Sequence, residues 1–144
     1  MHLSKILCPL DFSAASGPLL AYATALAGAT GAELCLLHVQ EPQPALSEAA
    51  DVPEAAVELA RYQLTAQQAG AARISTRLRR GEASCEIVRE AQEQGADLIV
   101  IGSHGQTGLT RFLMGNTAEH VVRTAPCATL LVKPQADKAY RQSA

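Results

Sequence analysis

The stretch DLIVIGSHGQTGLTRFLMGNTAE, residues 97–119, decides the fold class and points to a function. Its first five residues are strand-like and stop at Gly102, after which a glycine-punctuated loop leads to a second turn at Gly115. Main-chain N–H groups bind a phosphate well only where the backbone can approach closely, which glycine allows because it has no Cβ. The pattern favours a backbone cradle for an anion such as a nucleotide phosphate. An ordinary glycine-rich connection to a capped helix is the alternative.

The second turn carries the signs of a helix start. Asn116 is a favoured N-cap residue, and Glu119 follows three positions later, which resembles a capping box. The first N–H groups of a helix lack internal partners and carry the positive end of its dipole, so they attract anions. Two features argue against an anion at this helix start. An Asn116 cap would occupy one of these N–H groups, and the Glu119 carboxylate would repel an anion if it did not turn away.

Length and composition bound the class of protein. The chain has 144 residues, 48% of them hydrophobic and 18% charged, which predicts a single domain over 1–144 with a polar tail at 134–144. A net charge of −2 and few aromatic residues argue against nucleic-acid binding. No apolar run is long enough to span a membrane and no leader segment is recognisable, so we expect a cytoplasmic protein with no membrane contact. The four cysteines form no close pair and are expected to be buried free thiols.

Short apolar runs alternate with helix-patterned segments along the chain. Strands are expected at 5–10, 33–39, 74–79, 98–101 and 128–132. Helices are expected from 13 or 16 to 29, and at 51–68, 84–94 and 116–123, with a loop or mobile flap at 40–50. Such alternation, with nearly continuous apolar strands, predicts an α/β fold whose parallel sheet is covered by helices on both faces.

In open parallel sheets, ligands bind outside the carboxyl ends of the strands, where the strand order reverses. If the order is 3-2-1-4-5, the first and fourth strands meet there, and the glycine loop lies beside Asp11. Asp11 could accept hydrogen bonds from a ribose or an adenine, or hold a divalent cation, or simply cap the first helix in competition with Ser13. The main chain of Val39 could meet an adenine edge. His104 could donate to a phosphate or lie exposed in the loop.

Known enzyme fingerprints are missing. The chain has no G-x-x-x-x-G-K-[ST] motif, and the turn after the first strand has no glycine, which disfavours a nicotinamide or flavin dinucleotide enzyme. A Ser-His-Asp triad can be drawn from Ser13 or Ser103 with His104 and Asp11, but no nucleophile elbow surrounds either serine. A local run of arginines at 73–80 is expected to form a solvated face and not an RNA site.

Taken in order, these residues resemble those of a small universal stress protein, and the resemblance extends from about Leu3 to Lys133. Its most specific element is the pattern G-x2-G-x9-G followed by Ser or Thr, which here reads Gly102, Gly105 and Gly115. The opening ILCPLDFS at 6–13 and the closing segment at 125–132 agree as well. The chain departs from the pattern at Asn116, where the family has a hydroxyl.

The resemblance implies an adenine nucleotide alpha-hydrolase-like fold with strand order 3-2-1-4-5. Because all three glycines are kept, it implies that ATP or another adenine nucleotide binds, with or without Mg²⁺. Binding is expected to survive the departure at Asn116, because Asn keeps a side-chain donor and Thr117 adds a hydroxyl next to it. The adenosine part would meet the Asp11 region and the Val39 main chain, and the ribose and phosphates would meet 102–105 and 115–118. The implied site comprises Pro9, Leu10, Asp11, Ser13, Val39, Ile101, Gly102, Ser103, His104, Gly105, Gly115, Asn116, Thr117 and Ala118. The family also dimerises through its last strand, here Thr129, Leu130, Leu131 and Val132.

Three functions remain open. The first is a stress-response regulatory protein whose bound nucleotide orders loops that partners read. The second is a slow ATP-hydrolysing enzyme, which needs a positioned metal, a water-orienting base and a charge stabiliser, for which Asp11 and Arg111 are the nearby candidates. The third is a dimeric scaffold without a ligand, against which the intact glycines argue.

Overall fold

The computed structural model describes residues 2–42, 48–103 and 115–133 and, for 48–53, the backbone only. Within these ranges the chain forms five strands and four helices. The strands are β1 Lys5–Pro9, β2 Glu33–Gln40, β3 Ile74–Arg80, β4 Leu98–Gly102 and β5 Ala128–Val132. The helices are α1 Ser16–Thr30, α2 Glu48–Gln68, α3 Ala83–Gln94 and α4 Asn116–Thr124. The predicted tail at 134–144 lies outside the described residues.

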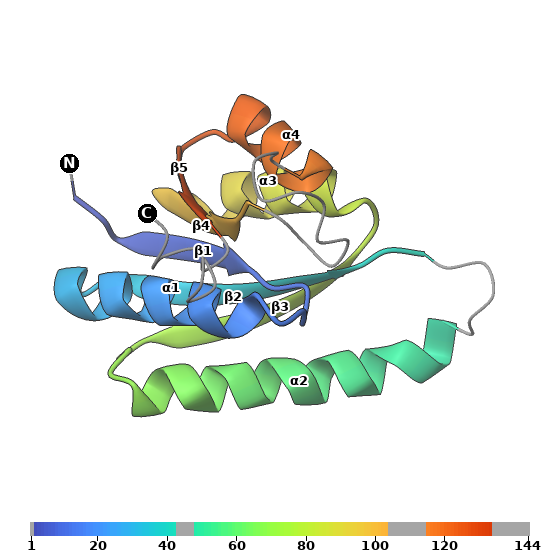
Figure 1. The fold of residues 1–144 in the computed structure, drawn as a ribbon, viewed down its shortest axis with the longest axis horizontal. Coiled ribbons are helices and arrows are strands. Elements are labelled where there is room, and N and C mark those ends of the chain that lie inside the picture. Colours follow the sequence, from blue (N-terminus) through green and yellow to red (C-terminus); the bar gives the residue numbers. More distant parts are fainter. Residues whose placement is uncertain (1, 43–47, 104–114, 134–144) are drawn as a thin grey trace, which may run out of the picture.

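The strands pair in parallel in the order β3-β2-β1-β4-β5, which confirms the predicted sheet (Figure 1). The predicted boundaries agree to within one residue for the strands. The loop expected through residue 50 is wrong at its end, because α2 already begins at Glu48. Glutamate and alanine are strong helix formers, and the segment Glu48-Ala49-Ala50 extends the helix by a turn toward the N-terminus.

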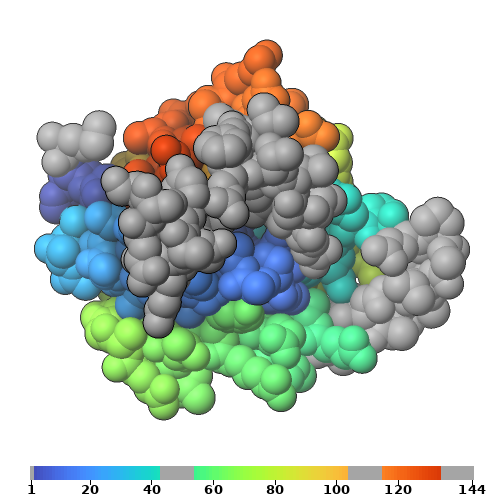
Figure 2. Space-filling view, viewed as in Figure 1, coloured from blue at the N-terminus to red at the C-terminus, as the bar shows by residue number. Residues whose placement is uncertain are grey.

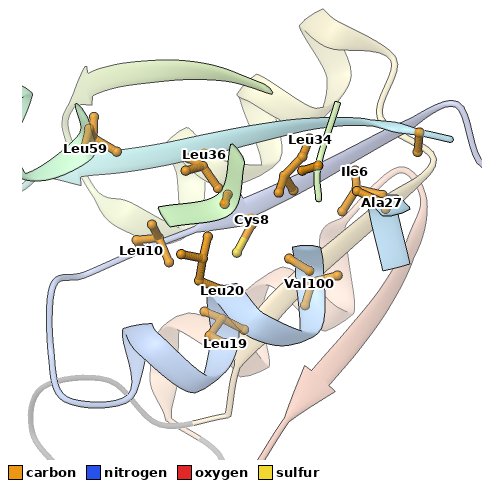
Figure 3. Close-up of a cluster of buried hydrophobic side chains, with 14 residues drawn as sticks. Ile6, Cys8, Leu10, Leu19, Leu20, Ala27, Leu34, Leu36, Leu59 and Val100 are labelled. Carbon is orange, nitrogen blue, oxygen red and sulfur yellow. The ribbon is translucent and has the colours of Figure 1, made fainter. Parts of the chain in front are cut away.

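Two hydrophobic clusters lie on opposite faces of the sheet. On one face α1 and α2 cover side chains such as Ile6, Leu36 and Val100, which Figure 3 shows pointing toward α1. On the other face α3 and α4 cover Leu7 and its neighbours. Figure 2 shows α2 (green) and α4 (orange) on opposite sides of the molecule. Because both faces are covered, successive side chains of each central strand are buried although they point to opposite faces. This explains the continuous apolar sequence of these strands.

The register brings the carboxyl ends of three strands to one level. Leu7 of β1 pairs with Cys35 of β2 on one side and with Ile99 of β4 on the other. Residues four positions further along each chain segment are Asp11, Val39 and Ser103. The reversal of strand order at β1 therefore places these three predicted site residues at the same edge of the sheet.

Arginine side chains of β3 form ion pairs with glutamates of α3. The Arg79 side chain is 15% exposed and pairs with Glu86 at 2.9 Å, Glu90 at 2.6 Å and Glu93 at 3.0 Å. Arg77 pairs with the fully buried Glu90 at 3.2 Å. The expected solvated face is therefore wrong for Arg79, because carboxylates from α3 reach down onto β3 and neutralise it.

Two further observations concern the described residues. No helix among them combines the length and apolar character that a membrane crossing requires. All four cysteines are free, as expected, but the expected burial is wrong for Cys85, which is exposed, and for Cys127, which is half-buried. Burial raises the pKa of the Cys8 thiol far above its usual value.

Candidate functional site

Asp11 orders the turn that follows β1. Its Oδ1 atom accepts hydrogen bonds from the Ser13 amide at 2.9 Å and from the Ser16 hydroxyl at 3.3 Å. The Ser13 hydroxyl in turn accepts from the amide of Ala15 at 3.3 Å. Neither side chain is the N-cap of α1, since that position belongs to Ala15, which makes no side-chain cap bond. Asp11 thus uses one carboxylate oxygen to shape the turn just before the helix.

The residue after Asp11 has an unusual backbone. Phe12 has φ 63°, and it is the only non-glycine residue with positive φ among the described residues. This left-handed conformation is costly for a bulky side chain and persists only where surrounding contacts hold it. The Phe12 ring stacks on His38, with centroids 4.0 Å apart and planes at 15°, and on Tyr62, at 5.7 Å and 6°. The turn is therefore held by rings from β2 and α2.

The main chain of Val39 faces the end of β1. The Leu10 amide donates to the Leu37 carbonyl at 2.7 Å, and the Gly81 amide donates to the Gln40 carbonyl at 3.1 Å on the other side of β2. Peptide groups of successive strand residues point to opposite sides, so those of Val39 point the same way as those of Leu37. Because β1 ends at Pro9, opposite Leu37, the Val39 groups point beyond the last β1 pair.

Both ends of the glycine loop are tied down by main-chain bonds. The Ser103 amide donates to the Val132 carbonyl at 3.0 Å, and the Gly115 amide donates to the Ser103 carbonyl at 2.7 Å. Ser103 is buried, and it follows Gly102, the last residue of β4. His104 and Gly105 lie outside the described residues. The amides of Ser103 and Gly115 therefore serve the fold and are not available to a phosphate.

The first turn of α4 differs from the predicted capping box. Gly115 occupies the N-cap position with φ −68° and ψ 159°, no side chain of the described residues caps the helix, and Asn116 is the first helical residue. The predicted Asn116 cap is wrong because Gly115 already has the extended backbone that an N-cap needs. Glu119 accepts from Arg123 at 2.8 Å, so its carboxylate is paired one turn further along the helix. Within the part of the chain that the structure describes, the amides of Asn116, Thr117 and Ala118 have no side-chain cap.

An acid-lined pocket of about 340 Å³ lies beside this helix start. Its lining consists of Glu41, Glu82, Ser84, Asn116, Thr117 and His120. The Ala83 amide donates to Glu41 Oε1 at 3.1 Å, and the Ser84 hydroxyl donates to Glu82 Oε1 at 2.7 Å. The hydrogen bond from Ser84, helped by one from Cys85, lowers the pKa of Glu82, so this carboxylate is charged at neutral pH.

Sequence reasoning assigned only Asn116 and Thr117 among these lining residues to the site. The other four, Glu41, Glu82, Ser84 and His120, were missed, because they come together only when the start of α3 packs beside the start of α4. Among the described residues, no group of three or more His, Cys, Asp or Glu side chains is arranged to hold a metal ion.

The sequence of this chain is similar to those of known proteins. The family model described as "Universal stress protein family" matches residues 2–133. The universal stress protein MJ0531 of Methanocaldococcus jannaschii is 46% identical over 61 residues, which is 42% of this chain and 36% of that protein. The match thus spans little more than a third of that relative's length.

Two solved structures extend the likeness to nearly the whole chain. One is the hypothetical protein MJ0577 of the same organism, with 27% identity and a TM-score of 0.85, covering 95% of this chain and 100% of that one. The other is a universal stress protein in complex with cAMP, with 26% identity and a TM-score of 0.78, covering 94% and 100%. The sheet order, the glycine-bounded loop and the family match agree, and the chain belongs to the universal stress protein family.

Proposed function

We propose that this protein binds an adenine nucleotide, ATP in the first instance, at the carboxyl edge of β1, β2 and β4. The observation that carries the proposal is the start of α4. Three amides there receive no cap from a side chain of the described ranges, and Gly115 holds them next to the end of β4 through its bond to Ser103. The positive end of a helix dipole and unpaired N–H groups together favour a phosphate. The cAMP complex of a structural relative supports the same class of ligand.

The adenosine half would lie between Asp11 and Val39. The register puts both residues at the level of Ser103, and the Val39 peptide groups point beyond the end of β1. An adenine edge carries one donor next to one acceptor and so matches a strand main chain. The Asp11 carboxylate accepts hydrogen bonds, which suits ribose hydroxyls. Pro9, Leu10, Ser13 and Ile101 would complete the walls around these groups.

The phosphates would meet the amides of Asn116, Thr117 and Ala118, with the Thr117 hydroxyl available as a further donor. His104 and Gly105 would add the contacts that the family pattern implies. The carboxylates of Glu41 and Glu82 already accept bonds at the start of α3, and they place negative charge on one side of the α4 start. We therefore place the phosphates on the opposite side, toward Gly102.

A divalent cation would be held chiefly by the triphosphate. Mg²⁺ commonly binds through one or two carboxylates together with substrate phosphates and water. The Asp11 carboxylate would be the protein group nearest to such an ion, and its Oδ1 atom already accepts bonds from Ser13 and Ser16. Mg²⁺ would then screen the charge of the phosphates and fix their orientation.

The role of the bound nucleotide would be regulatory. It would order the glycine loop and the β2–α2 connection, and partners would read the resulting surface. The protein would act as a homodimer through β5, whose outer edge has no strand neighbour among the described residues. An exposed apolar edge strand needs covering, and a symmetric dimer supplies that cover.

Nucleotide carried through purification tests the proposal directly. We expect heat-denatured protein to release an adenine nucleotide detectable by mass spectrometry, and isothermal titration of nucleotide-free protein to show ATP binding. Asp11→Ala should weaken this binding. If the natural chain neither carries nor binds any adenine nucleotide, the proposal is wrong, and a ligand-free scaffold is favoured. Steady phosphate release that Asp11→Ala abolishes would favour the enzyme instead.

A further inference from the structure

We infer that His38 is a positioning residue for the adenosine half of the site, because its ring fastens the turn that carries Asp11 to strand β2. This inference rests on the proposed function. Its basis is that a single residue, Leu10, immediately before Asp11, is held by β2 through both its amide and its carbonyl group. The two residues that hold Leu10, Leu37 and His38, are not among those expected to touch the nucleotide.

The two ends of Leu10 bind consecutive residues of β2. The Leu10 amide donates to the Leu37 carbonyl at 2.7 Å, and the Leu10 carbonyl oxygen lies 2.7 Å from Nδ1 of His38. A carbonyl can only accept, so Nδ1 of His38 carries the proton and donates. Leu10 is buried, with 3% of its surface exposed. Removing the His38 donor would take a hydrogen bond away from a buried carbonyl group, which is energetically costly.

The same ring also supports the residue on the other side of Asp11. Phe12 stacks on His38 at 4.0 Å, which is its closer ring contact, and Phe12 has the positive φ of 63°. Asp11 therefore lies between two residues that His38 holds, one by a hydrogen bond and one by stacking. Because Val39 follows His38 directly in β2, one residue sets the relative position of the two groups proposed to meet adenosine.

The ring donor can be separated from the ring surface by substitution. His38→Phe keeps an aromatic ring beside Phe12 and removes the donor. His38→Asn places an amide N–H near the position of Nδ1 and restores the donor without the ring. Tyr62→Leu is the matched control, because it removes the more distant stacking partner of Phe12 at 5.7 Å and leaves the bond to Leu10 intact.

Hydrogen exchange of the unliganded protein gives the first readout. The Ser13 amide donates to Asp11 Oδ1, so its protection reports the order of the turn. We expect His38→Phe to speed Ser13 exchange at least tenfold while amides of β4 stay unchanged, and His38→Asn to bring it back to within about threefold of the natural chain. Unchanged Ser13 exchange in folded His38→Phe would overturn the inference whatever the nucleotide does.

Titration with AMP gives the second readout. We expect His38→Phe to weaken AMP binding about tenfold, with His38→Asn within about threefold and Tyr62→Leu within about twofold of the natural chain. If the natural chain binds AMP and His38→Phe binds it equally well, this inference alone fails. If Tyr62→Leu weakens binding as much as His38→Phe, the donor has no special role and the inference also fails.

Two outcomes remain. If no adenine nucleotide binds the natural chain, the proposed function fails and this inference fails with it. If His38→Phe does not fold, His38→Ala replaces it in both measurements, with His38→Asn again as the rescuing variant and the same results expected.

Discussion

The Gly115 amide donates a hydrogen bond to the carbonyl oxygen of Ser103 at 2.7 Å, which joins the two ends of the loop 104–114. This bond brings the start of α4 against the end of β4. It also fixes Gly115 as the extended N-cap residue, so that the amides after it point out of the helix without a side-chain cap. The bond between Ser103 and Gly115 therefore brings the two glycine segments, at Gly102 and at Gly115, together into one proposed phosphate site.

Replacing Gly115 by valine should remove nucleotide binding. Its φ of −68° suits any residue, so a loss of binding would report crowding by the side chain and not backbone strain. We expect isothermal titration to show at least a tenfold weaker affinity for ATP, with Gly115→Ala between the two. Gly17→Ala is the control, since a Cβ there meets no atom within 4 Å. A folded Gly115→Val protein with natural affinity would contradict the site assignment.

Neutralising Glu82 should strengthen nucleotide binding. Its carboxylate lines the pocket beside Asn116 and Thr117, and its lowered pKa keeps it charged at pH 7. Removing one like charge near the phosphates in a watery setting should give roughly a twofold gain in ATP affinity at low salt. Added salt at about 0.5 M should abolish the gain.

Glu58→Gln provides the control for this charge effect. It changes net charge equally, on α2, where Glu58 forms only an exposed pair with Arg61. If both variants bind ATP alike in a low-salt titration, the local effect of Glu82 is disproved.

Arg79 should matter for stability far more than an exposed arginine. Arg79→Ala leaves the fully buried Glu90 with fewer partners, and breaking a buried ion pair typically costs about 3–5 kcal/mol. Arg77 still pairs with Glu90, so we expect a loss of about 3 kcal/mol in urea unfolding. Arg123→Ala, which breaks an exposed pair with Glu119, should cost under about 0.5 kcal/mol. Equal losses of stability in the two variants would show that the ion pairs of Arg79 stabilise the fold no more than an exposed pair does.

Stability should fall in acid partly through Glu90. Burial opposes ionisation of this carboxyl, but hydrogen bonds from Arg79 and Gln94 and the charges of Arg77 and Arg79 hold its pKa below the ordinary 4.5. The unfolded chain then binds the proton more tightly than the folded one. The Glu90 contribution is therefore present above about pH 4.5 and is lost as the pH falls through the folded-state pKa.

Urea unfolding at pH 7, 5, 4 and 3 measures this dependence. The natural chain should lose stability between pH 5 and 3 more steeply than Glu90→Gln, which carries no titrating group at that position. Parallel curves for the two proteins would mean that Glu90 titrates alike in the folded and unfolded states.

The proposed dimer should depend on the exposed surface of β5. Leu130 is 38% exposed although it belongs to an apolar strand. A buried aspartate in an apolar interface is strongly unfavourable, so Leu130→Asp should convert a dimer into monomers in sedimentation experiments. Leu64→Asp on α2, at a position 55% exposed, should leave the oligomeric state unchanged. A natural chain that sediments as a monomer would exclude this interface.

Local pattern was sufficient to locate the strands. Strand β4 was predicted at 98–101 and forms at Leu98–Gly102, because a strand covered on both faces needs an unbroken apolar run that only a few segments possess. The strand order 3-2-1-4-5 was implied by a resemblance carried by Gly102, Gly105 and Gly115, and it is confirmed. The start of α2 and the cap of α4 were misplaced, because several nearby residues suit each boundary almost equally well.

The sequence by itself determined which segments become strands and helices, and which edge of the sheet collects Asp11, Val39 and the glycine loop. The reason is that the hydrophobicity and the backbone freedom of each segment depend on its own residue types. Only the tertiary structure decided that Gly115 and not Asn116 caps α4, that His38 holds Leu10, and that Glu82 lies beside Thr117. Each of these features depends on segments far apart in the chain, since Gly115 is held by Ser103, Leu10 by His38, and Glu82 and Thr117 line one pocket. No local pattern encodes such a contact, because it arises only when the packing of the sheet and its helices brings the two segments together.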